Sequence, residues 1–384
     1  MYGDSSARPR SSSSAYRPWT TTTPDGFQDV GPAWDEAVAR MRRPTPFLLH
    51  GWLTAWWRVF EANTEVRVHA RYEGDRIVAA LPLRIDWNRC GLSKASILGS
   101  EMAPLADMVL DARAEPTVAA ETLDRGLLDV GILDMFPLPP ESPVLDYAKS
   151  GAHSRVLQSA RSPVFELDGD WDTAYRETYS NRRRALHRRR RRQLSSLGPL
   201  DVDIAKTTGD LTVALDEALA IHALRWSGRG DVTHFSSPVS RIFHRAAIAS
   251  LGESDVIRIL LLKVGGKAVA FVYFFVFVGR MYIYRLAFDP SMGRYSPGAI
   301  AVLEAMQSAM GEGVQTIEFL RGMDEYKLAW ANRIDRLERA LLSTSRPHQL
   351  AGEAISREAQ ARRRIQKLRG EVRRAYGARR RAAA

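Results

Sequence analysis

Three short apolar segments in the second half of the chain constrain the fold more than any other feature. Val256–Val264 leads through Gly265-Gly266 into Lys267–Val278, which leads through Gly279-Arg280 into Met281–Phe288. Short glycine-containing connections favour antiparallel hairpins, and the segments are rich in β-branched and aromatic residues. The longest apolar run, inside the middle segment, is too short to cross a bilayer as a helix. The sequence therefore predicts a buried three-stranded meander and no integral membrane segment.

Helical and strand patterns on both sides of the meander extend this prediction. The expected elements of the second half are, in order, a strand (Leu200–Lys206), a helix to about Trp226 capped by Asp210, a helix (Val239–Leu251), the meander, a helix (Pro297–Met310), a strand (Val314–Leu320) and a helix (Glu325–Trp330). A loop with Gly228 and Gly230 separates the first two helices.

The first half shows a second α/β pattern. A helix over FLLHGWLTAWWRVF is expected because Leu49, Leu53, Trp56 and Phe60 share one face. Two strands joined at Gly74-Asp75, a further strand pair, a helix and a last strand follow. The expected ranges are Glu65–Tyr72, Arg76–Leu83, Glu115–Leu128 and Gly131–Phe136, with Pro137, Pro139 and Pro140 ending the last strand.

The length of 384 residues and a break near Leu167–Trp171 indicate two domains of α/β (α+β) class. We expect a disordered polar leader over residues 1–26, domains over 27–168 and 169–347, and a basic helical tail over 348–384, with a seam at Ile365, Leu368 and Val372. The leader has no apolar region typical of a secretory signal. A single cysteine, Cys90, and no Cys/His cluster predict no disulfide, no metal site and a cytoplasmic location.

Positive charge is concentrated in two blocks. The net charge is +11, and from Glu353 onward eleven Arg and Lys face three Glu. A second block, NRRRALHRRRRR, occupies Asn181–Arg192 and is expected to be a helix with Tyr175, Tyr179, Leu186 and Leu197 as its buried stripe. Such blocks suit an anionic partner, either tRNA or a membrane surface, although a solvated basic face is the favoured interpretation of Asn181–Arg192.

The loop after the meander and the helix that follows it form the clearest candidate ligand site. A helix N-terminus presents unpaired backbone N–H groups and the positive end of the helix dipole. In DPSMGRYSPG, glycine permits close backbone approach and an arginine adds a charged donor, which suits the diphosphate of coenzyme A. Plain turn chemistry is the alternative, and the loop lacks the G-K-[ST] ending of a P-loop. The candidate residues are Gly293, Arg294, Tyr295, Ser296 and Gly298.

Six stretches resemble the GNAT superfamily acetyltransferases associated with cellulose and exopolysaccharide synthesis (CelD/BcsL type). They are FLLHGWLTAWW, RIVAALPL, SNRRRALHRRRRRQLSSLG, IHALRW, YIYRLAFDPSMGRYSPG and EFLRGMDEYKLAW, within about Phe47–Ser345. The resemblance implies tandem GNAT-like folds, of which the first is degenerate and the second binds acetyl- or acyl-coenzyme A. Where Glu318 stands, the family often has aspartate. A more distant resemblance reaches the peptidoglycan bridge-forming aminoacyltransferases, which use charged tRNA.

The resemblance also implies roles for individual residues. Strand N–H groups at Arg285, Leu286 and Ala287 would stabilise the thioester oxygen as it gains charge. Glu318 or His222 would take the proton of the attacking group, and Tyr326 would protonate the departing thiolate. The residues expected to line the acceptor site are Arg225, Trp226, Arg321 and Lys327.

Each of these roles has a structural alternative. Glu318 would instead be ion-paired with Arg321 or Arg285, and His222 would pack beside Trp226 as a core histidine. Tyr326 and Lys327 would be an ordinary core tyrosine and a solvated lysine. The predicted reaction is acyl transfer from acyl-coenzyme A to an amine or hydroxyl of a small-molecule or saccharide acceptor. The alternatives are an aminoacyl-tRNA-dependent peptidyltransferase and a non-catalytic adaptor that binds an anionic partner.

Overall fold

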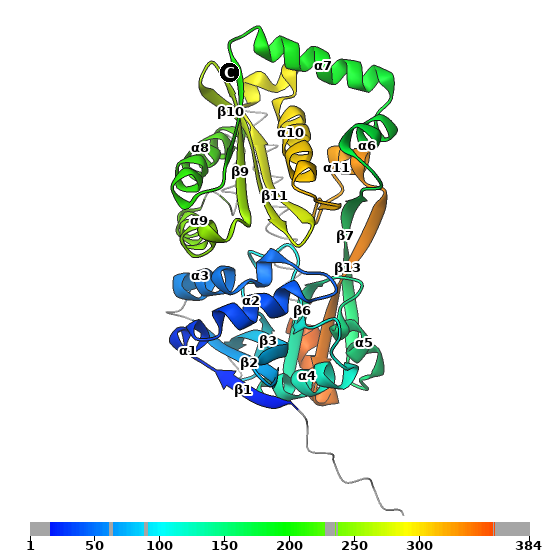
Figure 1. Ribbon diagram of the computed structural model, residues 1–384. Coiled ribbons are helices and arrows are strands. Elements are labelled where there is room, and N and C mark those ends of the chain that lie inside the picture. The colour runs from blue at the N-terminus through cyan, green and yellow to red at the C-terminus, as the bar shows by residue number, and fades with distance from the viewer. Residues whose placement is uncertain are drawn as a thin grey trace, which may run out of the picture.

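The computed structural model describes residues 16–60, 64–87, 91–226, 235, 237–355 and 357. Its described part forms one mixed sheet of 13 strands with helices on both faces, which confirms the expected α/β class. The strand order is β1-β2-β3-β4-β6-β13-β7-β12-β11-β10-β9-β8, with β5 paired to β3. Figure 1 shows that this sheet spans two halves of the molecule, stacked one above the other.

The first half holds the elements up to α5. They are β1 (Arg17–Thr21), α1 (Pro24–Gln28), α2 (Gly31–Ala39), η1 (Pro46–Leu48), α3 (His50–Phe60), β2 (Glu65–Glu73), β3 (Arg76–Trp87), β4 (Ser93–Ile97), β5 (Val109–Leu110), α4 (Pro116–Val130), β6 (Ile132–Leu138) and α5 (Pro143–Ser150). The strands β4 and β6 are parallel, and α4 crosses between them.

The second half follows the expected order of strands and helices. Its elements are α6 (Trp171–Thr178), α7 (Asn181–Ser195), β8 (Leu200–Ala205), α8 (Thr208–Trp226), α9 (Pro238–Leu251), η4 (Gly252–Ser254), β9 (Ile257–Val264), β10 (Lys267–Phe277), β11 (Arg280–Phe288), η5 (Pro290–Tyr295), α10 (Pro297–Gly311), β12 (Thr316–Glu318) and α11 (Glu325–Trp330). The meander β9–β10–β11 is antiparallel, as predicted.

The middle strand of the meander is apolar throughout because both of its faces are covered. Phe271, Tyr273 and Phe275 belong to the core that packs under α8 and α9. Val272 and Phe274 alternate with them and face α10 on the other side of the sheet. Figure 1 shows α8 and α9 on one side of β9–β11 and α10 on the other.

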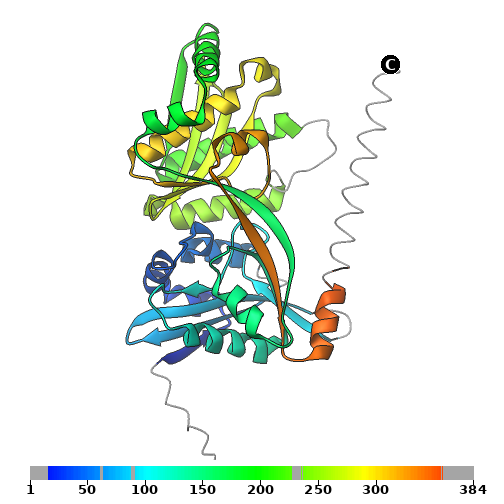
Figure 2. The same cartoon turned by 90° about the vertical axis from the view of Figure 1, so that its right-hand side faces the viewer.

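Two long strands join the halves into one sheet. β7 (Arg155–Glu166) pairs at its end with β12 of the second half, through Val164, Phe165 and Glu166. β13 (Arg333–Ser343) runs back along β7 and pairs at its end with β6 of the first half. Figure 2 shows these two strands passing side by side from one half to the other.

The halves also share a hydrophobic core. Trp52 of α3 packs edge-to-face against Phe243 of α9, with ring centroids 4.7 Å apart. Phe47 contacts Phe275 and Tyr284 of the meander at 5.3 and 5.7 Å. A Cβ added to Gly51 would stand 2.7 Å from Leu251 Cδ2, so α3 and α9 approach as closely as glycine allows.

Three local predictions are wrong. Asp210 is not the N-cap of α8: Thr207 takes that place, and its Oγ1 accepts from Asp210 N at 3.3 Å and donates to the Asp210 carboxylate at 2.8 Å. Pro137 does not end the last strand of the first half, because β6 continues to Leu138. The expected strand Val314–Leu320 is shorter, because only Thr316–Glu318 pair with neighbours.

The buried face of α7 also differs from the prediction. Leu186 and Leu197 are exposed, whereas His187 and Leu194 are buried and spaced by two helical turns. The reason is that α7 starts at a Ser180 cap and turns His187 toward Tyr175, whose hydroxyl lies 2.9 Å from His187 Nδ1. Tyr179 belongs to the buried stripe as expected.

Several predictions fall outside the described residues: most of the leader, Cys90, Gly228, Gly230 and the tail beyond residue 357. The described end of the leader is not disordered as expected, because it forms β1, which pairs with β2, and the start of α1. Within the described ranges, no helix is both long and apolar enough to cross a membrane. The same ranges contain no group of three or more His, Cys, Asp and Glu side chains that could hold a metal ion.

Candidate functional site

The strands β11 and β12 separate in the middle of the second half. Their parallel ladder ends at the pair Tyr282–Glu318, whereas β11 continues to Phe288. Beyond Glu318 the chain turns toward β7 instead, since Phe319 N donates to Pro163 O and Gly322 N to Arg161 O. Leu320 adopts a left-handed backbone (φ 59°) at this departure. Among the described strands, none therefore pairs with the β12-facing edge of residues 283–288, which includes the predicted N–H donors Arg285, Leu286 and Ala287.

A bulge in β11 lies at the same level. The β10–β11 register shifts between the pairs Tyr273–Arg285 and Phe274–Ile283, so that Tyr284 is the extra residue. Its ring is buried and its hydroxyl donates to Met102 O of the first half at 3.0 Å. A bulge bends the strand and re-aims its neighbours. Arg285, Leu286 and Ala287 follow directly after this bend.

The entry to α10 partly matches the predicted anion site. Pro297 is at N1 and has no N–H, while the N–H groups of Ala299 and Ile300 donate to Ser296 O at 3.1 and 3.3 Å. The Gly298 N–H, at N2, has no intrahelical acceptor. Ser296 has a left-handed backbone and no side-chain cap bond. The mouth of α10 therefore offers fewer amides than the sequence suggested, and Gly298 is the amide available to an anion.

The two loop glycines differ in their surroundings. A Cβ on Gly298 would stand 3.0 Å from Phe288 Cδ1, so this glycine lets α10 pack closely against β11. A Cβ on Gly293 would meet only Phe288 Cε2, at 3.8 Å. Arg294 is exposed, and its guanidinium lies over the Tyr295 ring at 4.6 Å and donates to the Tyr295 hydroxyl.

Glu318 pairs with two arginines inside the fold and is not positioned to act as a base. It is 0% exposed, and its carboxylate accepts from Arg43 Nε at 3.1 Å, Arg43 Nη2 at 2.8 Å and Arg280 Nη1 at 2.8 Å. The expected partners Arg321 and Arg285 are therefore wrong. A carboxylate closed off from solvent by two guanidiniums is not positioned to accept a proton from a substrate.

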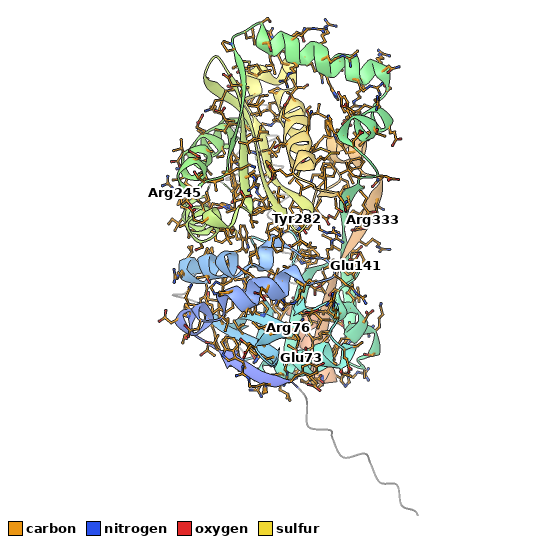
Figure 3. All side chains as sticks on the ribbon, in the orientation of Figure 1. Glu73, Arg76, Glu141, Arg245, Tyr282 and Arg333 are labelled. Atoms are coloured by element: carbon orange, nitrogen blue, oxygen red, sulfur yellow. The ribbon has the colours of Figure 1, made fainter. Side chains whose placement is uncertain are left out.

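Arg43 makes Glu318 part of an ion cluster between the halves. Its Nη1 also lies 2.7 Å from Asp335 of β13 and 3.3 Å from Glu141. Burial opposes the charge of Arg43, but Glu318 and the other carboxylates outweigh this and raise the pKa of Arg43 above its usual value. Tyr282 donates to Pro44 O beside this cluster. Figure 3 shows Tyr282, Glu141 and Arg333 at the junction of the two halves.

His222 is buried near the open edge of β11. Its ring lies 5.0 Å from the Phe235 ring and 6.1 Å from the Trp226 ring. Burial, together with the Arg285 guanidinium, lowers the pKa of His222 to about 4. The imidazole is therefore neutral at physiological pH, as a base must be, but it binds protons weakly.

The other α8 residues approach β11 as well. Arg225 lies over the Phe288 ring at 4.3 Å, and Trp226 is half-buried at the end of the helix. Arg285 itself lies over the Tyr284 ring at 4.1 Å and donates to Tyr284 O at 2.9 Å. The structure thus brings His222, Arg225 and Arg285 to one side of the β11 edge.

A second group of cations lies where β12 gives way to α11. Lys327 is buried, and its Nζ donates to Arg321 O at 2.8 Å and lies 3.5 Å from Asp324. Burial lowers the pKa of Lys327, and Arg285 and Arg321 lower it further, while Asp324 opposes them. Arg321 lies over the Phe136 ring of the first half at 5.3 Å. Lys327 and the two arginines that lower its pKa therefore form a group of cations, which favours a negatively charged group nearby.

Tyr326 lies on the α11 side of the same region. Its ring packs edge-to-face near Phe319, with centroids 6.4 Å apart. Burial raises the pKa of Tyr326 above its usual value, with a smaller contribution from Asp324. The hydroxyl therefore stays protonated at neutral pH and is a hydrogen-bond donor.

The arginine helix α7 borders the α10 mouth. It packs against η5 and α10, and Arg191 pairs with Glu304 of α10. Arg188, Arg189 and Arg192 are exposed and have no carboxylate partner among the residues that the structure describes. Figure 1 shows α7 lying across the end of the second half where α10 begins.

Sequence reasoning missed three features of this region. Arg43 and Arg280 lie far from Glu318 in the chain, and the bulge at Tyr284 breaks an otherwise regular alternation. No local pattern marks either ion pair. The bulge is visible only as a shift in register between YIY and RLAF once β11 is paired with β10, so the sequence alone does not show it.

Comparisons with known proteins agree with this geometry. The acetyltransferase (GNAT) domain model matches residues 180–328. The structure of FemX is similar with a TM-score of 0.62 at 10% identity, over 84% of this chain and 96% of FemX. The C-terminal domain of a putative lysylphosphatidylglycerol synthetase from Agrobacterium fabrum is similar with a TM-score of 0.54 at 13% identity, over 86% and 96% of the two chains. No curated protein matches the sequence. The chain therefore has a GNAT-type acyltransferase fold.

Proposed function

We propose that the chain transfers an acyl group, acetyl first among the candidates, from acyl-coenzyme A to an amine or hydroxyl of an acceptor. The observation that carries the proposal is the separation of β11 from β12 beside the mouth of α10. In this arrangement a donor's thioester would lie along the open edge of residues 283–288, and its diphosphate would lie at the Gly298 N–H and Arg294. Residues 27–168 would then serve as the half without a donor site, and 169–347 as the half that holds it.

The chemistry proposed for this site is direct attack on the thioester. The nucleophile's nitrogen or oxygen bonds to the acyl carbon, the carbon–sulfur bond breaks, and the thiolate leaves. Backbone N–H groups among Arg285, Leu286 and Ala287 would stabilise the carbonyl oxygen as it gains charge. Tyr326 would give its proton to the thiolate, and water or His222 would take the nucleophile's proton. Most of the rate would come from positioning, because no strong base faces this edge in the described residues.

The acceptor that we propose is a saccharide or small molecule carrying a negative charge. Arg285, Arg321 and Lys327 supply cations on the acceptor side, and Arg225 and Trp226 would add a guanidinium and an aromatic wall. The assignment to exopolysaccharide or cell-envelope synthesis rests on the resemblance of the six sequence stretches alone, and the proposed cytoplasmic location rests on the single cysteine.

The test is calorimetric titration of the full chain with coenzyme A. We expect micromolar affinity for the wild type and roughly tenfold weaker binding for Arg294→Ala, because a charge-assisted contact to phosphate is lost. Arg182→Ala, on the exposed face of α7, is the matched control and should change the affinity much less. Equal affinities in the wild type and Arg294→Ala would contradict the loop assignment.

A second candidate function is transfer from an aminoacyl-tRNA. The observation that favours it is that Arg188, Arg189 and Arg192 of α7, beside the α10 mouth, are exposed and have no carboxylate partner in the described part of the chain, since a longer anionic donor would cover both. Binding of tRNA with steep salt dependence, in the absence of coenzyme A binding, would favour this candidate. Binding of a polyanion with no transfer to any acceptor would instead favour a non-catalytic adaptor.

A further inference from the structure

A cavity of about 320 Å³ lies in the first half of the chain, and all the residues that line it belong to that half. It lies between the loop joining α2 to η1, the segment around β5, and the helices α4 and α5. Its walls are mainly apolar, with Met41, Met108, Leu110, Ala119 and Pro143 among them. A volume of this size is at the lower end of the range for small-molecule sites.

The cavity occupies the counterpart of the α10 mouth. In the second half, α10 joins β11 to the parallel strand β12; in the first half, α4 joins the β4–β5 region to β6, which is parallel to β4. Pro116 at the start of α4 and Glu141 after β6 both line the cavity. The chemistry at the helix start is reversed, however, because the N-cap of α4 is Glu115 and no glycine loop precedes it.

Asp107 gives this cavity a specific polar group. Its side chain is 4% exposed, and its Oδ1 accepts from Ser142 Oγ at 2.7 Å and from Met108 N at 2.8 Å. Ser142 is itself fixed as the N-cap of α5. The second oxygen, Oδ2, has no donor among the residues that the structure describes. Burial raises the pKa of Asp107 to about 7, because the loss of hydration outweighs the hydrogen bonds from Ser142 and Met108 that favour the ionised form.

Most of the other charged groups that line the cavity are already paired, including Asp146, whose Oδ1 lies 2.8 Å from Lys149 Nζ. Arg43 is already engaged by Glu318, Asp335 and Glu141, and Asp111 by Arg40 and Arg76. The titratable and charged groups lining the cavity are Arg42 and Arg43 from the α2–η1 loop, Asp107 and Asp111 beside β5, Glu141 after β6, and Asp146 and Tyr147 of α5. Acidic groups therefore outnumber the basic ones, and Arg42 is the lining cation without a carboxylate partner in the described ranges.

We propose that this cavity binds a small primary amine with an aliphatic body, whose ammonium group donates to Asp107 Oδ2. The apolar walls suit the body, and the ionised carboxylate suits the ammonium group. Two sources share this chemistry: a simple alkylamine and an apolar amino acid, whose carboxylate would reach Arg42. The site is separate from the acyl donor site, and the proposal stands whether or not the chain uses coenzyme A.

The experiment is titration of the full chain with three matched probes followed by NMR. The probes are 3-methylbutylamine, L-leucine, and 4-methylpentanoate, which is leucine without its amino group. We expect saturable binding of at least one of the two amino compounds and at least tenfold weaker binding of 4-methylpentanoate. Binding of leucine alone would identify an amino-acid site, and binding of the amine, with or without leucine, an amine site. No saturable binding of any probe, or equal binding of the carboxylate, would overturn the proposal.

Two variants and a pH series make the test specific. Asp107→Asn keeps an acceptor for Ser142 and Met108, and it should weaken amine binding about tenfold or more. Ala120→Trp should block binding by filling the cavity, while Asp201→Asn, on β8, should leave it unchanged. Affinity should rise roughly tenfold from about pH 6 to about pH 8, as Asp107 ionises, and this rise should vanish in Asp107→Asn. Undiminished binding by folded Asp107→Asn would contradict the proposed contact.

Discussion

At the scale of single residues, burial decides which charged side chains only stabilise the fold and which can contact a ligand. Glu318 was a candidate base on the grounds of its strand position alone. The structure gives it two guanidiniums, one of them from Arg43, 275 positions earlier in the chain. No sequence periodicity reports a pairing across that distance, whereas the partners of Thr207 and Asp210 lie within one helical turn and follow a known capping pattern.

Replacing Glu318 with Gln should destabilise the fold without altering the chemistry directly. The substitution keeps the shape but leaves Arg43 and Arg280 without their shared carboxylate, and we expect a loss of about 3 kcal/mol in the free energy of unfolding. Urea denaturation measures this loss. Glu177→Gln, at an exposed position of α6, is the control and should change stability little. A stable Glu318→Gln variant with a shifted pH–rate profile would restore the residue as a base.

His187 should make stability sensitive to acid. Burial, with Arg183 and Arg190 nearby, lowers the pKa of His187 from 6.5 to about 4. Between these values the unfolded chain binds a proton that the folded chain does not, so stability falls as pH drops from 6.5 toward 4. At about pH 5, this protonation of the unfolded chain lowers the free energy of unfolding by up to roughly 2 kcal/mol. Urea titrations at several pH values should show a smaller acid-side loss in His187→Gln, and an unchanged loss would contradict this account.

At the scale of elements, the most informative segment is the connection from β11 to α10. The sequence predicted its strand, loop, Pro297 start and helix, because apolar alternation and proline placement are local signals. The sequence did not reveal how many backbone N–H groups at the start of α10 lack an intrahelical acceptor, because that number depends on the backbone conformation of Ser296. The role of Gly298 was also different: the residue faces Phe288, so its missing Cβ serves the packing of helix on strand.

This packing role can be separated from ligand binding by a double-mutant cycle. Gly298→Ala should destabilise the fold by about 1–2 kcal/mol, because its Cβ would press on Phe288. Combining it with Phe288→Leu should recover part of the loss, which thermal unfolding of the four proteins measures. Gly293→Ala, where a Cβ meets its nearest atom at 3.8 Å, should be tolerated. Additive losses in the double variant would argue against the contact.

At the scale of the whole molecule, the arrangement of the halves was the least predictable feature. The order from β8 to α11 followed from local patterns, whereas β1, α1, α2 and α5 of the first half were not predicted. The passage of β7 and β13 from one half to the other could not be predicted from the sequence. Val164 and Arg333, which pair, lie far apart in the chain. Strand pairing of this range carries no signature in either segment alone. It nevertheless creates the single sheet in which β12 is held apart from the end of β11.

The central claim is that this opening and the α10 mouth together hold an acyl donor with a diphosphate. A crystal structure of the full chain with coenzyme A tests it most directly. The account predicts that the diphosphate lies at the Gly298 N–H beside Arg294 and that the pantetheine arm follows residues 283–288. Coenzyme A bound elsewhere, or a bound diphosphate that does not contact the Gly298 N–H, would contradict it.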